Sequence, residues 1–200
     1  MTRREIKKAR TREAIVQASL ELFLARGFEG TTADDIAAAS GISRRTFFRY
    51  FPTKEAAFFA NQEIRLQQFR QMIAEPLPDE TGYGTARRCL MHMAAIYMAE
   101  RRIAVAQQDI VRVSRSLMAH ELQLDYKWED AIAVALVRDG GPAARSESEA
   151  RWLAGAIMGM TRSVLREWFG VGGQRDLVAM GEQALAQLER GFGLAAGEGG

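Results

Sequence analysis

The sequence contains little cysteine or proline and no long apolar run, and each shortage excludes a class of protein. Cys89 is the only cysteine, so no disulfide can form within the chain, which fits a reducing cytosol. Only four of the 200 residues are proline and 48% are apolar, which indicates a folded chain with a real core. The longest apolar runs, such as residues 132–137, are far shorter than the ~20 residues of a membrane span. The first ten residues, MTRREIKKAR, lack the apolar segment of a secretory signal, so we expect a soluble cytoplasmic protein.

Histidine is also scarce, and this shortage argues against metal-dependent or histidine-based catalysis. Cys89 and His92 would share one helix face, but two ligands do not make a metal site. His120-Glu121 begins like the helix of a zinc protease, yet position 124 is leucine where a second histidine would be needed. No phosphate-binding loop of the G-x-x-x-x-G-K-[ST] kind occurs. The sequence therefore predicts no enzyme: no catalytic residue, no metal and no cofactor.

Charge is unevenly distributed along the chain. Residues 1–54 hold eleven Lys/Arg against six Asp/Glu, a surplus of five positive charges, whereas residues 55–200 hold sixteen against nineteen. A basic N-terminal quarter on a mildly acidic body is typical of a nucleic-acid-binding end. A solvated basic face with no partner would give the same count.

Helical periodicity runs through the chain, and no strand pattern competes with it. Ile15, Ala18, Leu22 and Phe23 repeat at the spacing of one buried helix face, and Gly27 follows as a helix stop. N-cap residues then mark helix starts at Thr32 (with Asp35), Ser43, Thr53 and Ser146 (with Glu149). We predict an all-α fold of about nine helices: one ending at 27, one each after Thr32 and Ser43, then 54–74, 82–100, 103–113, 116–139, 147–169 and 175–191. Breaks are expected at 75–79, at Gly140-Gly141-Pro142 and at 170–173.

Residues 32–51 carry the strongest functional pattern. They form two short predicted helices broken at Ser40-Gly41, and the second carries three arginines. A short basic helix in this position is typical of one that lies in the major groove, where arginine can bind guanine with two hydrogen bonds. Phe47, Tyr50 and Phe51 fall where they would hold this helix against the preceding ones. We expect DNA contacts from the helix starts and the outer face: Thr31, Thr32, Ser43, Arg44, Arg45, Thr46, Arg49, Tyr50 and Lys54. An ordinary helical hairpin with a solvated basic face is the alternative.

The basic N-terminal end leaves two readings open. Its cationic residues could follow a minor groove or the DNA backbone, or they could form a disordered solubilising end. These residues are Arg3, Arg4, Lys7, Lys8, Arg10 and Arg12.

Over residues 10–60 the sequence resembles the tetracycline-repressor (TetR/AcrR-like) family of bacterial transcriptional regulators. The matching residues are Phe23, Gly27-Phe28, Thr31-Thr32-Ala33-Asp34-Asp35-Ile36-Ala37, Gly41-Ile42-Ser43, Thr46-Phe47-Phe48, Tyr50-Phe51-Pro52 and Lys54-Glu55. One departure is Phe48, where the family often has a tyrosine whose hydroxyl can reach a phosphate. The resemblance implies an N-terminal three-helix helix-turn-helix domain at 1–55, a connecting helix at 54–74, and a ligand-binding and dimerisation domain at 75–200.

The resemblance also implies an effector pocket and a two-fold dimer made by the last two helices. Apolar stripes and small residues at Gly155-Ala156 and Gly159 on these helices could serve an interface or simply core packing. Methionine and aromatic residues suit an adaptable pocket, and they are frequent in this half: Met91, Met93, Met98, Met118, Met158, Met160, Tyr97, Tyr126, Trp128 and Trp152. Core filling is again the alternative for any one of them. Tyr97, Met118 and Trp152 are our expected ligand contacts, and an anionic effector could also use Arg162 or Arg166.

From these patterns we expect a homodimeric repressor that binds a palindromic double-stranded operator and is released by an apolar or amphipathic small molecule. A transcriptional activator of the same family, and a helical small-molecule-binding or partner-binding protein without DNA function, are the alternatives.

Overall fold

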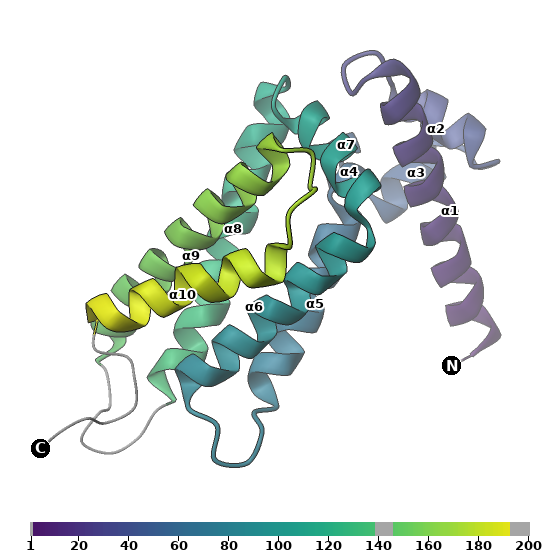
Figure 1. Ribbon diagram of the computed structural model, residues 1–200. Helices are drawn as coiled ribbons and strands as arrows, with labels where there is room; N and C mark the ends of the chain where they lie inside the picture. The colour runs from purple at the N-terminus through teal and green to yellow at the C-terminus, as the bar shows by residue number, and fades with distance from the viewer. Residues whose placement is uncertain (1, 139–145, 193–200) are drawn as a thin grey trace, which may run out of the picture. The chain divides into compact units, whose positions relative to one another are not determined.

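The computed structural model describes residues 2–138 and 146–192, and every regular element within these ranges is a helix (Figure 1). The helices are α1 (Arg3–Arg26), α2 (Ala33–Ala39), α3 (Arg44–Tyr50), α4 (Lys54–Phe58), α5 (Ala60–Ala74), α6 (Gly82–Ala99), α7 (Arg101–Val111), α8 (Arg115–Val137), α9 (Glu147–Gly170) and α10 (Leu177–Phe192). The all-α prediction is confirmed. The expected break at Gly140-Gly141-Pro142 lies outside the described residues.

Two helices differ from the prediction. The expected helix 54–74 is divided at Phe59, which is the C-cap of α4 and leaves the helical conformation with a ψ of 10°. Two successive phenylalanines are buried at this division: Phe58 packs on Phe23, and Phe59 stacks on His120 at 4.7 Å. At the other end of the chain α1 begins at Arg3, behind a capping box of Thr2 and Glu5. The basic N-terminal end is therefore helical and not a disordered end.

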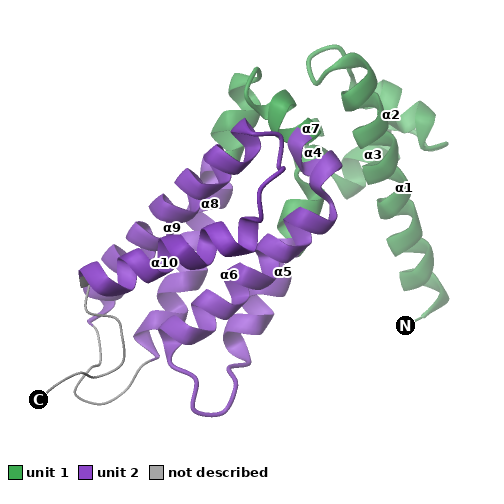
Figure 2. Cartoon of the chain, viewed as in Figure 1, with its two compact units in different colours: residues 1–64, 106–121 green, residues 65–105, 122–200 purple. Residues whose placement is uncertain are grey.

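The chain divides into two compact units (Figure 2). The first unit comprises residues 1–64 and 106–121, and the second unit comprises 65–105 and 122–200. The first unit therefore contains all of the segment expected to bind DNA, residues 1–55, together with 56–64 and a part of α7 and α8.

An aromatic core holds the first unit together. The rings of Phe23, Phe28 and Phe58 meet pairwise with centroids 5.1, 5.5 and 5.9 Å apart. Ile15 of α1 and Ile36 of α2 are also fully buried in this unit. Aromatic pairs at such distances stabilise beyond the area that they bury, so this small unit has a rigid centre.

The second unit has a larger aliphatic core, in which α10 packs on α6 and α9. Cys89 lies in this core without exposure. The turn between α9 and α10 requires glycine at 173, because its φ is +69° and a Cβ there would lie 2.7 Å from Cγ of Arg101. Trp168 closes the same turn by donating its indole N–H to the carbonyl of Arg175 at 2.8 Å.

Polar ties join the helices of the second unit. Arg87 of α6 donates to both Glu182 and Glu189 of α10. Glu80 accepts two hydrogen bonds from Arg88, at 2.7 and 2.8 Å, and one from the hydroxyl of Thr85. These contacts hold the pKa of Glu80 at about 2, chiefly because Arg88 stabilises the carboxylate. None of the described helices is long and apolar enough to cross a membrane.

Candidate nucleic-acid interface and ligand cavity

The local sequence builds a tight helix-turn-helix. Thr32 caps α2 and Asp35 completes the capping box, as predicted. Gly41 then takes a φ of +67°, a conformation that favours glycine, and lets the N–H of Ile42 bond to the carbonyl of Ala37 at 3.0 Å. Ser43 caps α3 by accepting from the N–H of Thr46. The angle between α2 and α3 is therefore fixed by backbone hydrogen bonds.

The inner and outer faces of α3 differ sharply. Phe47 has no exposed surface and Phe51 is buried, which confirms that these two residues hold the helix against the unit's core. Arg44, Arg45, Phe48 and Arg49 are exposed, whereas Thr46 and Tyr50 are half-buried. The buried rings thus orient a cationic face outward.

The three arginines of α3 are not equivalent. Arg44 donates to Asp34 of α2 at 2.6 Å and lies over the Phe48 ring, so an acid already shares its charge. Arg49 lies over the ring of Tyr50. Arg45 has no acidic partner among the described residues. It is the arginine on α3 that is most available to a base edge or phosphate.

Two predicted phosphate contacts have structural partners instead. Thr31 is fully buried and its hydroxyl donates to the carbonyl of Gly27 at 2.9 Å, so the expectation that it faces DNA is corrected. Lys54 donates to the carbonyls of Phe28 and Thr31, at 2.8 and 3.2 Å, and lies over the Phe28 ring. Its ammonium group also lies 3.9 Å from a carboxylate oxygen of Glu29. A phosphate contact by Lys54 stays a prediction.

Three further side-chain hydroxyls predicted to contact DNA lie near the helix starts and bond within them. The hydroxyl of Thr32 bonds to the Asp35 carboxylate, and those of Ser43 and Thr46 lie 2.9 Å apart. All three side chains remain at least partly exposed. A DNA contact by any of them stays a prediction.

The second unit contains an apolar cavity between α6, α8, α9 and α10. It holds about 760 Å³ of empty space, including the part open to solvent. Its walls are mainly methionine and aliphatic side chains: Leu90, Met91, Met93, Ala94, Tyr97, Asp125, Trp128, Met158, Met160, Thr161, Val164, Leu165, Leu177, Gly181, Ala184 and Leu185. An apolar, methionine-rich wall of this character suits a small apolar molecule.

Asp125 is the one charged residue in this wall. Its carboxylate lies 3.4 Å from Nε of Arg162, which is partly exposed on α9. Burial raises the pKa of Asp125, and the charge of Arg162 opposes that rise. The cavity therefore presents one hydrogen-bonding carboxylate in otherwise apolar surroundings.

The expected ligand contacts are partly corrected. Tyr97 lines the cavity, but Met118 lies in the first unit and Trp152 is 73% exposed on α9, so neither contributes to the wall. Four of the six methionines from the sequence pattern do line it, as does Trp128. Asp125 and the α10 residues were missed, although Asp125 precedes Trp128 by three positions and so shares its helix face.

The apolar stripe of α10 and one of the arginines expected to bind an anionic effector both have partners within the second unit. The apolar stripe of α10 packs inward through Leu177, Leu185 and Leu188, and Arg162 forms the ion pair described above. Across the described ranges, no group of three or more His, Cys, Asp or Glu is placed to hold a metal ion.

A helical chain with a basic helix-turn-helix in one unit and an apolar cavity in the other has the organisation of a transcriptional regulator. The chain belongs to the tetR family of bacterial regulatory proteins: residues 15–60 match the model of that family's N-terminal part, and residues 94–193 match the model described as the MftR C-terminal domain. It is a TetR-family transcriptional regulator.

Curated relatives and solved structures agree with this assignment. The regulator TcmR of Streptomyces glaucescens is 28% identical over 177 residues, covering 83% of this chain and 76% of TcmR. The putative mycofactocin biosynthesis regulator MftR of Mycobacterium tuberculosis is 24% identical, covering 81% of each chain. Thermus thermophilus FadR, solved with lauroyl-CoA, is similar over 94% of this chain and 100% of its own, with a TM-score of 0.65 and 25% identity. SmeT, solved with triclosan, has the same fold over 90% of each chain, with a TM-score of 0.67 and 21% identity.

Proposed function

We propose that this regulator is a cytoplasmic repressor that binds a palindromic DNA operator as a homodimer and is released by a small-molecule effector. The outward cationic face of α3 carries the proposal. Phe47 and Phe51 hold the helix rigidly from behind, and Arg45 has no acidic partner among the described residues. Such an arginine can bind guanine with two hydrogen bonds and so select a base.

The apolar cavity supports the effector part of the proposal. Its methionine-rich wall can repack around ligands of different shape. The similar proteins FadR and SmeT were solved with lauroyl-CoA and triclosan, respectively, which favours an apolar or amphipathic effector here. Release from DNA requires that the effector bind the DNA-incompetent conformation more tightly than the competent one.

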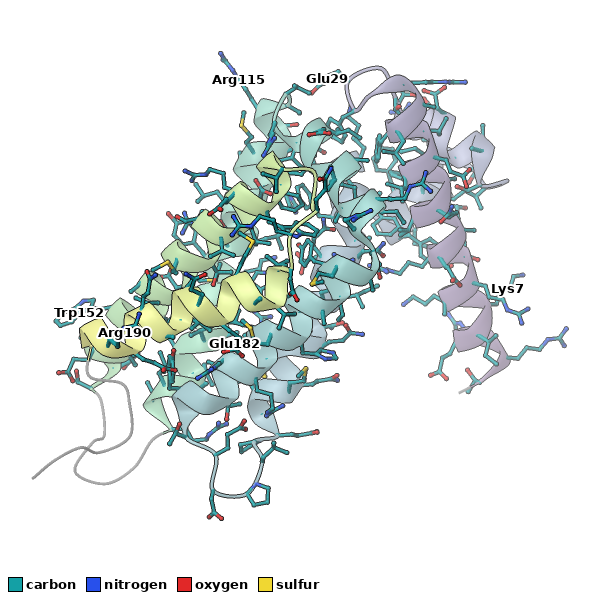
Figure 3. The ribbon with its side chains drawn as sticks, viewed as in Figure 1. Lys7, Glu29, Arg115, Trp152, Glu182 and Arg190 are labelled. Atoms are coloured by element: carbon teal, nitrogen blue, oxygen red, sulfur yellow. The ribbon has the colours of Figure 1, made fainter. Side chains whose placement is uncertain are left out.

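The exposed face of α9 supports the homodimer. Trp152 projects from this helix (Figure 3), and Gly155, Ala156 and Gly159 follow it at helical spacing with only partial burial. Small residues beside a large exposed aromatic allow two helices to approach closely around one anchor. A two-fold dimer would place its two α3 helices roughly 34 Å apart, one turn of DNA.

Substitution of the α3 arginines tests the proposal. An operator would first be selected from random duplex DNA with the wild-type protein. Arg45→Ala should weaken operator binding about 5-fold to 150-fold for each half-site, because it removes roughly 1–3 kcal/mol of base recognition per protomer. Arg49→Ala should weaken operator binding as well. Arg70→Ala, which removes an exposed charge from α5 in the second unit, is the matched control and should bind like wild type.

All three variants should remain dimeric, as measured by native mass spectrometry. If Arg45→Ala and Arg49→Ala both bind the operator like wild type at matched salt, α3 is not the reading helix. The proposal would then be wrong.

A further inference from the structure

The N-terminal half of α1 is a helical arm with strongly basic side chains. The helix starts at Arg3 behind its capping box, and residues 2–10 are all exposed. Lys7 projects from this part of the helix (Figure 3). A helix holds its charged side chains at fixed spacing, whereas a disordered end would not.

One face of this arm forms a groove with α3 and the turn that precedes it. On the α1 side the groove is lined by Arg4, Lys7, Lys8 and Thr11, which lie at the i, i+3, i+4, i+7 positions of a single helix face. On the other side it is lined by Ile42, Thr46, Arg49 and Tyr50. The groove holds about 1150 Å³ of empty space, including open solvent.

The groove is charged with one sign. Arg4, Lys7, Lys8 and Arg49 all line it, and no carboxylate does. None of these four cations has an acidic partner among the described residues. Like charges at neighbouring helix positions repel each other, so a bound anion would stabilise this arrangement.

A second contact fixes the arm against the reading segment. Arg12, one turn further along α1, lies over the ring of Phe51 at 5.1 Å from its centroid, and Phe51 directly follows α3. The cationic face of α1 therefore keeps a defined position beside Thr46 and Arg49. Those two residues belong to the helix that is proposed to enter the major groove.

We infer that this groove binds the sugar-phosphate backbone of the duplex that α3 reads, so that α1 acts as a second DNA-binding element. This inference rests on the proposed function. Residues 4 to 11 extend over about 10 Å of helix, enough for about two successive phosphates of one strand and too long for a single phosphate ion. Phosphate contacts of this kind add affinity and orientation without selecting sequence.

Two double variants on the same helix test the inference. Lys7→Ala/Lys8→Ala removes two charges from the groove, whereas Arg3→Ala/Arg10→Ala removes two exposed charges that do not line it. Each variant would be titrated with the selected operator and with a 30-base-pair duplex of random sequence, over a series of salt concentrations. Circular dichroism would check that α1 is intact in both.

Each lost phosphate contact lowers the slope of log affinity against log salt by about 0.9, so the groove variant should lose roughly 2 to 4 from that slope per dimer. At low salt its affinity for both duplexes should fall by about tenfold or more. Its preference for the operator over the random duplex should be unchanged. The control variant should lose less than half as much slope.

Equal losses in the two double variants would show a general charge effect and overturn the inference, as would an unchanged slope in the groove variant. These outcomes leave the proposed function intact if Arg45→Ala still weakens operator binding. If the wild-type protein prefers no sequence, the proposed function is wrong. The salt slopes of the two double variants on the random duplex would still show whether the groove binds phosphates.

Discussion

The two units are filled with different kinds of apolar side chain. Seven of the ten phenylalanines lie in the first unit, whereas seven of the nine methionines belong to the second. Phenylalanine rings pack with defined geometry, and methionine is flexible and adapts to irregular space. The difference matches the proposed tasks, because a reading helix needs one fixed orientation and an effector cavity needs a wall that can repack.

Removal of the Phe47 ring, which packs behind α3, should have the largest effect. It tests whether the stability of the first unit depends on its aromatic packing. Phe47→Ala removes a side chain with no exposed surface, so the free energy of unfolding should fall by about 3–5 kcal/mol and operator binding should be lost. Phe48→Ala, at the exposed neighbouring position, should cost less than about 1 kcal/mol. Urea denaturation measures both, and equal losses would contradict the assigned faces of α3.

An acid titration tests whether the second unit depends on polar ties in addition to its adaptable core. The pKa of Glu80 is lowered to about 2 in the folded protein, so its carboxylate stabilises the fold above its ordinary pKa of 4.5. This contribution is lost as the pH falls from 4.5 through 2. Glu80→Gln should lower the free energy of unfolding by about 1–3 kcal/mol at pH 7 and flatten its fall over that range.

Urea denaturation at a series of pH values measures the free energy of unfolding of wild type and of Glu80→Gln. Glu147→Gln is a suitable control, since Glu147 is exposed in its contact with Arg151 and should contribute little. Parallel pH profiles for wild type and Glu80→Gln would contradict the assignment of this tie.

Filling the cavity is the smallest expected effect and tests whether the methionine-lined space binds ligands. Val164→Trp places a larger side chain in the cavity wall, so it should weaken binding of the fluorescent apolar probe anilinonaphthalene sulfonate about tenfold, or about 1.4 kcal/mol. Gln68→Trp adds the same ring at an exposed position of α5 and should leave probe binding unchanged. Fluorescence titration measures the affinity, and wild-type affinity in Val164→Trp would exclude the cavity as the probe's site.

Features encoded by a few neighbouring residues were predictable from the sequence. The capping boxes at Thr32 and Ser146, the turn at Gly41 and the inward rings of Phe47 and Phe51 all depend on local spacing, and all are confirmed. The start of α1 was missed although Thr2 and Glu5 carry the same capping-box spacing.

Features that depend on tertiary packing were harder to predict. Thr31 looked like an exposed helix-start residue, but the return of the chain around Gly27 buries its hydroxyl. The cavity wall comes from four helices that are distant in sequence, so composition indicated its methionines but could not separate Tyr97 from Trp152. The division at Phe59 likewise depends on contacts made by Phe58 and Phe59 with other helices.

The position of Cys89 has a practical consequence for measuring conformational change. Its side chain has no exposed surface, and burial raises the pKa of its thiol, so the reactive thiolate is suppressed. The native protein should therefore be almost inert to maleimide reagents. A cysteine introduced at one exposed position would then take up a spin label or fluorophore by itself, without removal of the native residue. Two such labels in a dimer would report the separation of its reading helices directly, with and without effector.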